Sequence, residues 1–263
     1  MKAIGYTEFG PPEVLRVLEL PEPHAGRGQV RVRVQACAVN PADTAARSGW
    51  MRRTYAPDTL PGGKYPEPPY VPGWDFCGVV DESADGAAIP VGQQVIGLTL
   101  SPMGDVGAYA EYVVTDAGSV VRAPGNATAA AASTLLMNAL TAYAMLEALA
   151  VPAGGTVAVT GAAGALGGYA VQLAKSQGLQ VVADAAETDE QLVKELGADI
   201  VVRRGDKVAT ASVARYLTAS TVSSTPHCTR TRSFPRSAMA APPPPPANMS
   251  ASPTETLCGT QCP

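Results

Sequence analysis

The chain is poor in histidine, cysteine and basic residues, and each shortage excludes a class of protein. Its 263 residues include two histidines, five cysteines, and 19 lysines and arginines against 23 acids, for a net charge of -4. A nucleic-acid-binding domain needs a basic surface, so we expect no nucleic-acid partner. Five cysteines do not make a disulfide framework, which favours a reducing compartment, and we expect the cytoplasm.

Long apolar runs are also missing. Residues Met1 to Gly5 lack the apolar core of a signal peptide. The longest uncharged stretch, between Arg122 and Glu147, is mostly alanine and is interrupted by proline, asparagine, serine and threonine. This composition favours a buried helix over a membrane span, so we expect no membrane partner. Because 46% of the residues are hydrophobic, the chain can bury one or two domain cores.

Residues 209–263 are nearly devoid of glycine and acidic residues. They hold one glycine of the chain's 26 and one acid of its 23, and they include five consecutive prolines from Pro242 to Pro246. Such a segment cannot bury enough apolar surface to offset chain entropy, so we expect a low-complexity tail. Two origins stay open: a natural Ser/Pro-rich tail, or a frameshifted read. Back-translation of residues 220–234 with GC-rich codons, read in another frame, gives a strand-like start followed by a helix-like run.

Residues 1–125 are typical of a β domain. Residues 29–36 alternate polar and apolar side chains, which is the period of a half-buried strand. Residues 79–80, 95–98 and 109–114 predict further short strands, and turns rich in glycine and proline separate them. Many short strands with such turns favour a barrel-like or sandwich-like β domain.

Residues 126–208 change to an alternation of helices and strands. They predict, in order, a helix over 128–149, a strand over 156–160, a helix over 169–177, a strand over 180–183, a helix over 189–196 and a strand over 199–202. This order predicts α/β architecture with a doubly wound parallel sheet. Only three strands are readable where a full sheet has about six, so we expect an incomplete sheet with an unpaired edge.

A glycine-rich turn joins the first of these strands to the next helix. Gly164 and Gly167 match the last two glycines of the dinucleotide-binding pattern G-x-G-x-x-G, and Ala162 stands at the first. A pyrophosphate must approach backbone N–H groups at a helix N-terminus, where glycine leaves room. The alternative is a tight turn with no ligand. The predicted cofactor-binding residues of the turn are Gly161, Ala162, Ala163, Gly164, Ala165, Leu166 and Gly167.

Asp184 at the end of the second strand bears on the choice of cofactor. An acid there accepts hydrogen bonds from the ribose hydroxyls of NAD, whereas a base favours the phosphate of NADP. No base follows Asp184 before Lys194, so the residues alone favour NAD. The alternative is that Asp184 and Glu187 are solvated acids at a strand end.

Several motifs occur in the order of one known family. They are Met1 to Ile4, Gly10 to Leu15, Val39-Asn40-Pro41-Ala42-Asp43, Val71 to Val80, Gly107 to Tyr112, Leu140-Thr141-Ala142-Tyr143, the glycine turn, and Leu196 to Asp199. On these residues the chain, up to about residue 208, resembles the zinc-independent quinone oxidoreductases of the medium-chain dehydrogenase/reductase superfamily. The resemblance implies a GroES-like catalytic β domain over 1–125, a Rossmann domain over 126–208, and frequent homodimers.

The resemblance also implies an activity. It is hydride transfer from NADPH, the family's usual cofactor, to a small-molecule quinone or α,β-unsaturated carbonyl. Family members often carry a base where Glu187–Glu190 stand, so NADH remains the alternative cofactor. The other functional readings are an enoyl reductase of polyketide type and a truncated, noncatalytic dinucleotide-binding relic.

Zinc-dependent relatives bind catalytic zinc with cysteine, histidine and a nearby glutamate. By resemblance the matching positions are Asn40, Trp74 and Asp75, and asparagine and tryptophan cannot supply the thiolate and imidazole that zinc prefers. We therefore expect no metal site and no zinc. Cys37 and Cys77 are expected to be small core residues.

Three residues are candidate catalytic groups by resemblance. Asn40 is expected near the nicotinamide and the substrate, and Thr141 near the nicotinamide. Asp43 is expected to orient the Asn40 loop or to cap the following turn. A purely structural role is the alternative for each. The segment 49–66 is longer than usual for the family and predicts either an aromatic rim for a flat substrate or an exposed loop.

Overall fold

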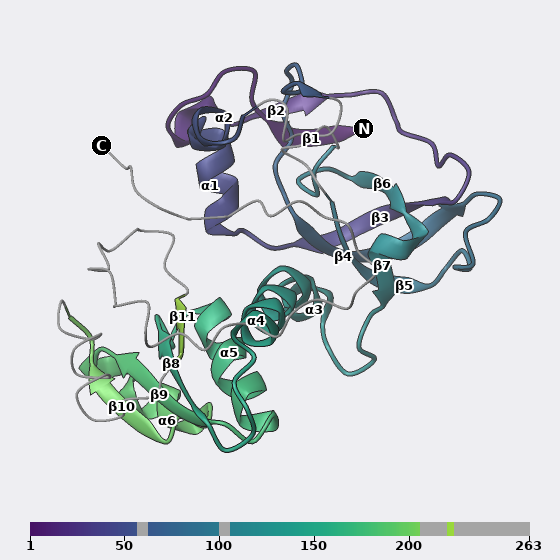
Figure 1. Ribbon diagram of the computed structural model, residues 1–263. Coiled ribbons are helices and arrows are strands. Elements are labelled where there is room, and N and C mark those ends of the chain that lie inside the picture. The colour runs from purple at the N-terminus through teal and green to yellow at the C-terminus, as the bar shows by residue number, and fades with distance from the viewer. Residues whose placement is uncertain (57–62, 100–105, 206–219, 224–263) are drawn as a thin grey trace. The chain divides into compact units, whose positions relative to one another are not determined.

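The computed structural model describes residues 1–56, 63–99, 106–205 and 220–223 (Figure 1). The chain divides into two compact units, residues 1–140 and 141–263. Most of the segment 209–263, including the second histidine, lies outside the described residues.

An antiparallel sheet of five strands forms the core of the first unit, in the order β6-β3-β4-β5-β7. Its strands are β3 (Gln29–Cys37), β4 (Asp75–Ser83), β5 (Gln94–Leu98), β6 (Tyr112–Asp116) and β7 (Val120–Arg122). A separate hairpin pairs β1 (Lys2–Gly5) with β2 (Arg16–Glu19). The alternation predicted for β3 is real, because Val30 and Val32 are fully buried against Phe76 and Val80. The expected β domain is therefore confirmed.

Short helices flank this sheet. A 3-10 helix covers Pro12–Val14, and α1 (Pro41–Arg47) and α2 (Trp50–Thr54) follow β3. Pro41 occupies the first turn of α1, where its missing N–H costs nothing. Gly49 joins the two helices with a φ of 75°, a left-handed conformation that glycine adopts at little cost. Asn40 is thereby fixed between the end of β3 and the start of α1.

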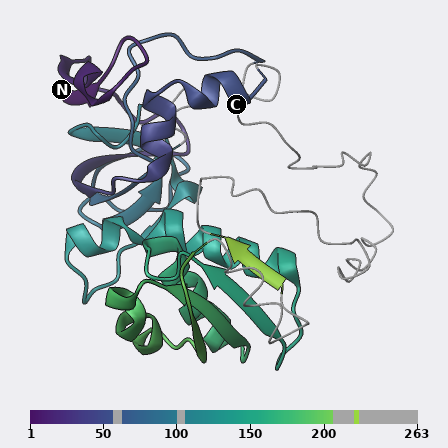
Figure 2. The same ribbon diagram turned by 90° about the vertical axis from the view of Figure 1, so that its left-hand side faces the viewer.

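The second unit contains a parallel sheet in the order β10-β9-β8-β11. Its elements are β8 (Thr156–Thr160), α5 (Ala165–Ser176), β9 (Gln180–Ala185), a 3-10 helix (Glu187–Asp189), α6 (Glu190–Glu195), β10 (Ile200–Arg203) and β11 (Ser220–Ser223). Its core packs Val157, Val159, Val171 and Val181 together. The doubly wound parallel sheet is confirmed. Within the described residues this sheet has four strands, fewer than the about six of a full sheet, so the expected incomplete sheet is confirmed. Its edge strands are β10 and β11, and β11, the yellow-green strand in Figure 2, pairs with β8 although it lies in the segment expected to be a tail.

The uncharged stretch forms two consecutive helices rather than one. These are α3 (Ala129–Ser133) and α4 (Leu135–Leu149), and the break is at Thr134, whose hydroxyl donates to the Ala131 carbonyl at 2.9 Å. Among the described residues, 129–149 is the one stretch long and apolar enough to cross a membrane, with a mean hydropathy of 1.4. The expectation of a buried helix is wrong for most of its length, because only Ala132, Ser133, Ala142 and Leu146 are buried.

Two of the boundary differences in the second unit concern the predicted cofactor residues. Helix α5 begins at Ala165, four residues before the predicted start at Tyr169, because Gly164 acts as its N-cap. Strand β9 continues to Ala185, so Asp184 lies inside the strand instead of at its end. Both shifts change the environment of the predicted cofactor residues.

Candidate functional site

The Asp43 carboxylate accepts hydrogen bonds from two loops of the first unit. Its side chain is 5% exposed, and its Oδ2 accepts the Asn40 backbone N–H at 2.8 Å. Its Oδ1 accepts the Gly73 N–H, also at 2.8 Å. Asp43 therefore caps α1 and orients the loop that carries Asn40, so both roles expected from the sequence are present at once.

Asn40 is 6% exposed and its side-chain amide is held on both sides. Its Nδ2 donates to Asp75 Oδ1 at 2.8 Å, and its Oδ1 accepts from Asn138 Nδ2 at 3.3 Å. Asp75 is fully buried, and its Oδ2 accepts the Met137 N–H at 3.3 Å. We call Asp75, Asn40 and Asn138 the amide chain. Asn138 was not predicted: its only signal is one polar residue in an apolar helix, and its partner Asn40 is 98 positions away.

The titratable side chains beside the amide chain are carboxyls, a thiol and a phenol. Burial raises the pKa of the Asp43 and Asp75 carboxyls, and the nearby Asp43 raises the pKa of Asp75 further. Burial, with these two carboxyls, also raises the pKa of the Cys37 thiol. The pKa of the neighbouring Tyr109 is raised by the same causes. These groups favour their protonated forms more than they would in water.

The donor chemistry of this cluster does not fit zinc. The Trp74 indole N–H is buried without a hydrogen-bond partner in the described chain, and it cannot coordinate a metal. Asn40 turns its amide nitrogen toward Asp75. Over residues 1–56, 63–99, 106–205 and 220–223, no group of three or more His, Cys, Asp or Glu side chains gathers to hold a metal ion. Cys77 is fully buried in the core as expected, whereas Cys37 is half-buried.

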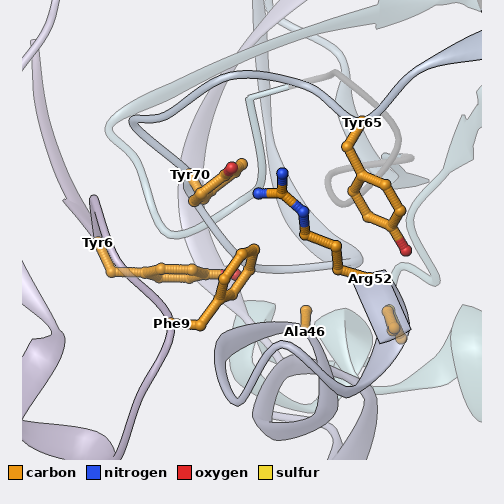
Figure 3. Close-up of a pocket in the computed structure, with 7 residues that line it drawn as sticks. Tyr6, Phe9, Ala46, Arg52, Tyr65 and Tyr70 are labelled. Carbon is orange, nitrogen blue, oxygen red and sulfur yellow. The ribbon is translucent and has the colours of Figure 1, made fainter. Parts of the chain in front are cut away.

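The segment after α1 packs on aromatic side chains, of which Phe9 and Tyr70 come from outside the segment. Figure 3 shows Arg52 between Phe9 and Tyr65, and its guanidinium lies 5.7 Å and 5.6 Å from the two ring centroids. Phe9 also stacks on Tyr70 with centroids 5.2 Å apart. The remaining cavity is about 20 Å³, too small to admit a further ring. Residues 57–62 of the expected aromatic rim lie outside the described residues.

The two glycines of the dinucleotide pattern have different roles. A Cβ on Gly167 would lie 2.2 Å from the Gly161 carbonyl oxygen and 2.7 Å from Ala162 Cα, so packing alone requires glycine there. A Cβ on Gly164 would meet only the Gly161 carbonyl oxygen, at 3.2 Å. Gly164 also has φ -82° and ψ 167°, which any residue can adopt. Its lack of a side chain keeps the approach to α5 open instead.

The start of α5 fits a pyrophosphate. Ala165, Leu166 and Gly167 form its first turn, whose N–H groups have no partner within the helix, and the helix dipole favours an anion there. Ala163 and Gly164 precede this turn. The glycine turn, the helix start and the parallel sheet together can hold a dinucleotide. Thr141, the other residue expected near the cofactor, is half-buried on α4.

The Asp184 side chain is buried, and both of its carboxylate oxygens have partners. It is 5% exposed, and its Oδ1 accepts the N–H groups of Gly161 at 2.6 Å and Ala162 at 3.4 Å. Its Oδ2 lies 3.3 Å from Arg204 Nε. Two of the N–H groups predicted to face the cofactor are therefore engaged by Asp184. The alternative of a solvated acid at the strand end is wrong for this residue.

Two arginines that the sequence argument missed lie at this end of the sheet. Arg203 ends β10 and pairs with Glu187 at 3.1 Å, and both side chains are more than 70% exposed. Arg204 follows and is 44% exposed. Both lie beyond Lys194 in the sequence, and the parallel pairing of β10 with β9 brings them to the end of the strand that carries Asp184. A search for bases at the ends of all adjacent strands would find them.

Comparison with known proteins gives a consistent set of similarities. Residues 26–125 match the alcohol dehydrogenase GroES-like domain. A quinone oxidoreductase from Lama guanicoe is 33% identical over 79% of this chain and 60% of its own length. A mycobacterial structure complexed with NADPH is 32% identical, with a TM-score of 0.65 over 78% of this chain and 58% of that one. An NAD-dependent alcohol dehydrogenase structure is 30% identical, with a TM-score of 0.70 over 82% of this chain and 67% of that one.

These similarities cover only part of the relatives. The chain spans 52% to 63% of the length of the curated relatives it matches.

Proposed function

Because the chain belongs to the medium-chain dehydrogenase/reductase superfamily, we propose that it is a zinc-independent reductase that uses NADPH to reduce a quinone or an α,β-unsaturated carbonyl. The quinone oxidoreductases among its relatives support this substrate class. The single observation that carries the proposal is the glycine turn, where Gly164 leaves the N-terminus of α5 open to a pyrophosphate. Bound NADPH would supply the hydride.

NADPH rather than NADH is proposed on the strength of the two arginines. Arg203 and Arg204 are partly exposed bases beside Glu187 and Asp184, where the adenosine ribose of a dinucleotide lies in this fold. A guanidinium can bind a phosphate with paired N–H groups. Asp184 already accepts two backbone N–H groups and pairs with Arg204, so less of its capacity is left for ribose hydroxyls. The relative complexed with NADPH supports the same choice.

We propose zinc independence because the first unit lacks suitable side chains at the positions that match zinc ligands. By resemblance, Asn40 and Trp74 match the positions of zinc ligands in zinc-dependent relatives, and they offer an amide and an indole, neither of which replaces a thiolate or an imidazole. Reduction of a conjugated carbonyl is the chemistry that needs a Lewis acid least, because hydrogen-bond donors and solvent can stabilise the charge on oxygen. Asn40 and Thr141 are proposed to lie near the nicotinamide, with Asp43 holding the Asn40 loop.

The test is a fluorescence titration of the full chain with NADPH, followed by a panel of quinones, enones and thioester-linked enoyl substrates. We expect saturable binding and turnover with quinones or simple enones. Turnover restricted to enoyl thioesters would identify the polyketide-type enoyl reductase instead. NADPH binding without any turnover would identify the noncatalytic relic, and no binding at all would overturn the proposal.

We also propose that the protein is cytoplasmic and forms a homodimer. The cytoplasm rests on the sparse cysteines, although one relative is named as mitochondrial. The homodimer rests on the family, and sedimentation analysis tests it.

A further inference from the structure

Helix α2 carries two arginines and no acid, and the two guanidinium groups have different partners. Arg53 Nη1 donates to the Ser48 carbonyl oxygen at 3.1 Å. Arg52 has no hydrogen bond or ion pair in the described part of the chain, and its guanidinium lies over the rings of Phe9 and Tyr65 (Figure 3). A ring face attracts a cation through its quadrupole, so these contacts orient Arg52 and leave its N–H groups free to donate to a ligand.

Two exposed aromatic side chains lie on either side of Arg52 in the sequence. Trp50 is 41% exposed and Tyr55, the residue that ends α2, is 45% exposed. Their rings meet edge to face, with centroids 6.3 Å apart. Burial raises the pKa of the Tyr65 hydroxyl, the Arg52 charge lowers it and Tyr55 raises it, so both side chains lie near Tyr65. We call Trp50, Arg52, Tyr55 and Tyr65 the arginine patch.

The arginine patch combines exposed ring surface with a positive charge that no described carboxylate neutralises. Tryptophan and tyrosine offer flat apolar surface to another ring. A guanidinium binds a carboxylate or a sulfonate with paired N–H groups. The cavity beside Arg52 is about 20 Å³, so a ring can lie only on the exposed side of the patch. Charge complementarity therefore favours a ligand that is both aromatic and anionic.

We infer that the arginine patch binds a flat aromatic ring that carries an acidic group. Arg52 pairs with the oxyanion, and Trp50 and Tyr55 contact the ring. The substrate of the reductase is then an aromatic quinone with a carboxylate or sulfonate substituent. This choice of substrate rests on the proposed function, whereas binding to the patch involves neither NADPH nor the second unit.

Anthraquinone-2-carboxylate and anthraquinone-2-carboxamide are the probes, because they share one ring system and a similar shape but differ in charge. The full chain is titrated with each by calorimetry, in the absence of NADPH. We expect the parent to bind the carboxylate about three- to tenfold more tightly than the carboxamide, the effect of one charge-assisted pair at an exposed site. This preference should shrink as the salt concentration rises.

Three variants at exposed positions separate the charge from the ring contact. Arg52→Gln removes the charge and should bind the two probes alike. Arg33→Gln makes the same change of net charge on β3 and should keep the parent's preference. Trp50→Leu should weaken binding of both probes by about the same factor, roughly threefold, because it removes a ring and leaves Arg52 in place.

The outcomes distinguish this inference from the proposed function. A parent that binds neither probe, or that binds both equally, would overturn the inference and leave an NADPH-dependent reductase standing. A preference that survives in Arg52→Gln, or that is lost equally in Arg33→Gln, would also overturn it. A preference lost only in Arg52→Gln, together with no turnover of any quinone, would support the anion site and overturn the proposed function.

Discussion

Arg204 Nε lies 3.3 Å from Asp184 Oδ2, so the acid that the sequence assigned to a ribose is paired with a base from the next strand. The pair joins β9 to the residue that follows β10. Asp184 is buried and Arg204 is partly exposed, so a phosphate can reach the guanidinium more readily than a hydroxyl can reach the carboxylate.

We expect Arg203→Ala and Arg204→Ala each to weaken NADPH binding about tenfold and to change NADH binding by less than about twofold, because only NADPH carries the additional phosphate. Fluorescence titrations at low and high salt measure both, and the NADPH effect should shrink as salt rises. Lys194→Ala is the control, since Lys194 pairs with Glu190 on the surface of α6. Equal losses for both cofactors would contradict the assignment.

Gly164 and Gly167 should respond differently to alanine. Gly164→Ala places a methyl group at the approach to α5 and should weaken NADPH binding at least tenfold, with the free energy of unfolding changed by less than about 1 kcal/mol. Gly167→Ala forces a methyl group against the backbone of Gly161 and should lower the free energy of unfolding by about 1–3 kcal/mol. Urea unfolding and NADPH titration on each variant separate the effects. Unimpaired binding by Gly164→Ala would show that the pyrophosphate lies elsewhere.

Tyr6 should govern part of the stability at high pH. It is 3% exposed, and burial, with the neighbouring Tyr70 and Asp43, raises its pKa from 10.0 to about 12. A raised pKa in the folded state means that the folded protein holds the hydroxyl proton more tightly than the unfolded chain does. The stabilising contribution is therefore complete below pH 10 and is lost as the pH rises through about 12.

Urea unfolding across this range should show the parent losing stability more steeply than Tyr6→Phe, which has no hydroxyl to ionise. The ultraviolet difference spectrum of parent and variant should show tyrosinate forming near pH 12. A difference spectrum that titrates near pH 10 would show that Tyr6 is not shielded.

Zinc should be neither bound nor needed. Metal analysis of the purified protein should give far less than one zinc per chain, because Asn40 and Trp74 offer an amide and an indole where zinc prefers a thiolate and an imidazole. A chelator should leave the free energy of unfolding and NADPH binding unchanged. One zinc per chain, or a loss of NADPH binding on chelation, would refute the prediction.

The composition of residues 209–263 leads to a prediction about the coding DNA. We expect a second reading frame that continues from about residue 209 with glycines, acids and apolar periodicity. A chain translated in that frame should bind NADPH more tightly and unfold at higher urea concentration than this one, because a longer sheet buries more apolar surface. A coding sequence with no open second frame would favour the natural Ser/Pro-rich tail.

Local patterns were sufficient to predict the elements that hold the candidate site. The alternation over 29–36 predicted β3, and the strand over 156–160 has the bounds predicted for it. The glycine turn was placed correctly after β8, although α5 starts earlier than predicted, so that Gly164 is its N-cap and Gly167 lies in its first turn. Such features depend on neighbours within a few residues, so their physical causes are visible in the sequence.

The partners of the site residues were decided by tertiary structure. Asn138 and Asn40 are 98 positions apart, and only the packing of the chain brings their amides together. Arg204 reaches Asp184 because β10 pairs with β9 in parallel, which aligns the ends of the two strands. The sequence alone determined which chemical groups are available, such as an amide where zinc would need a thiolate. The fold decided which of these groups are buried, which are paired, and which remain open to a ligand.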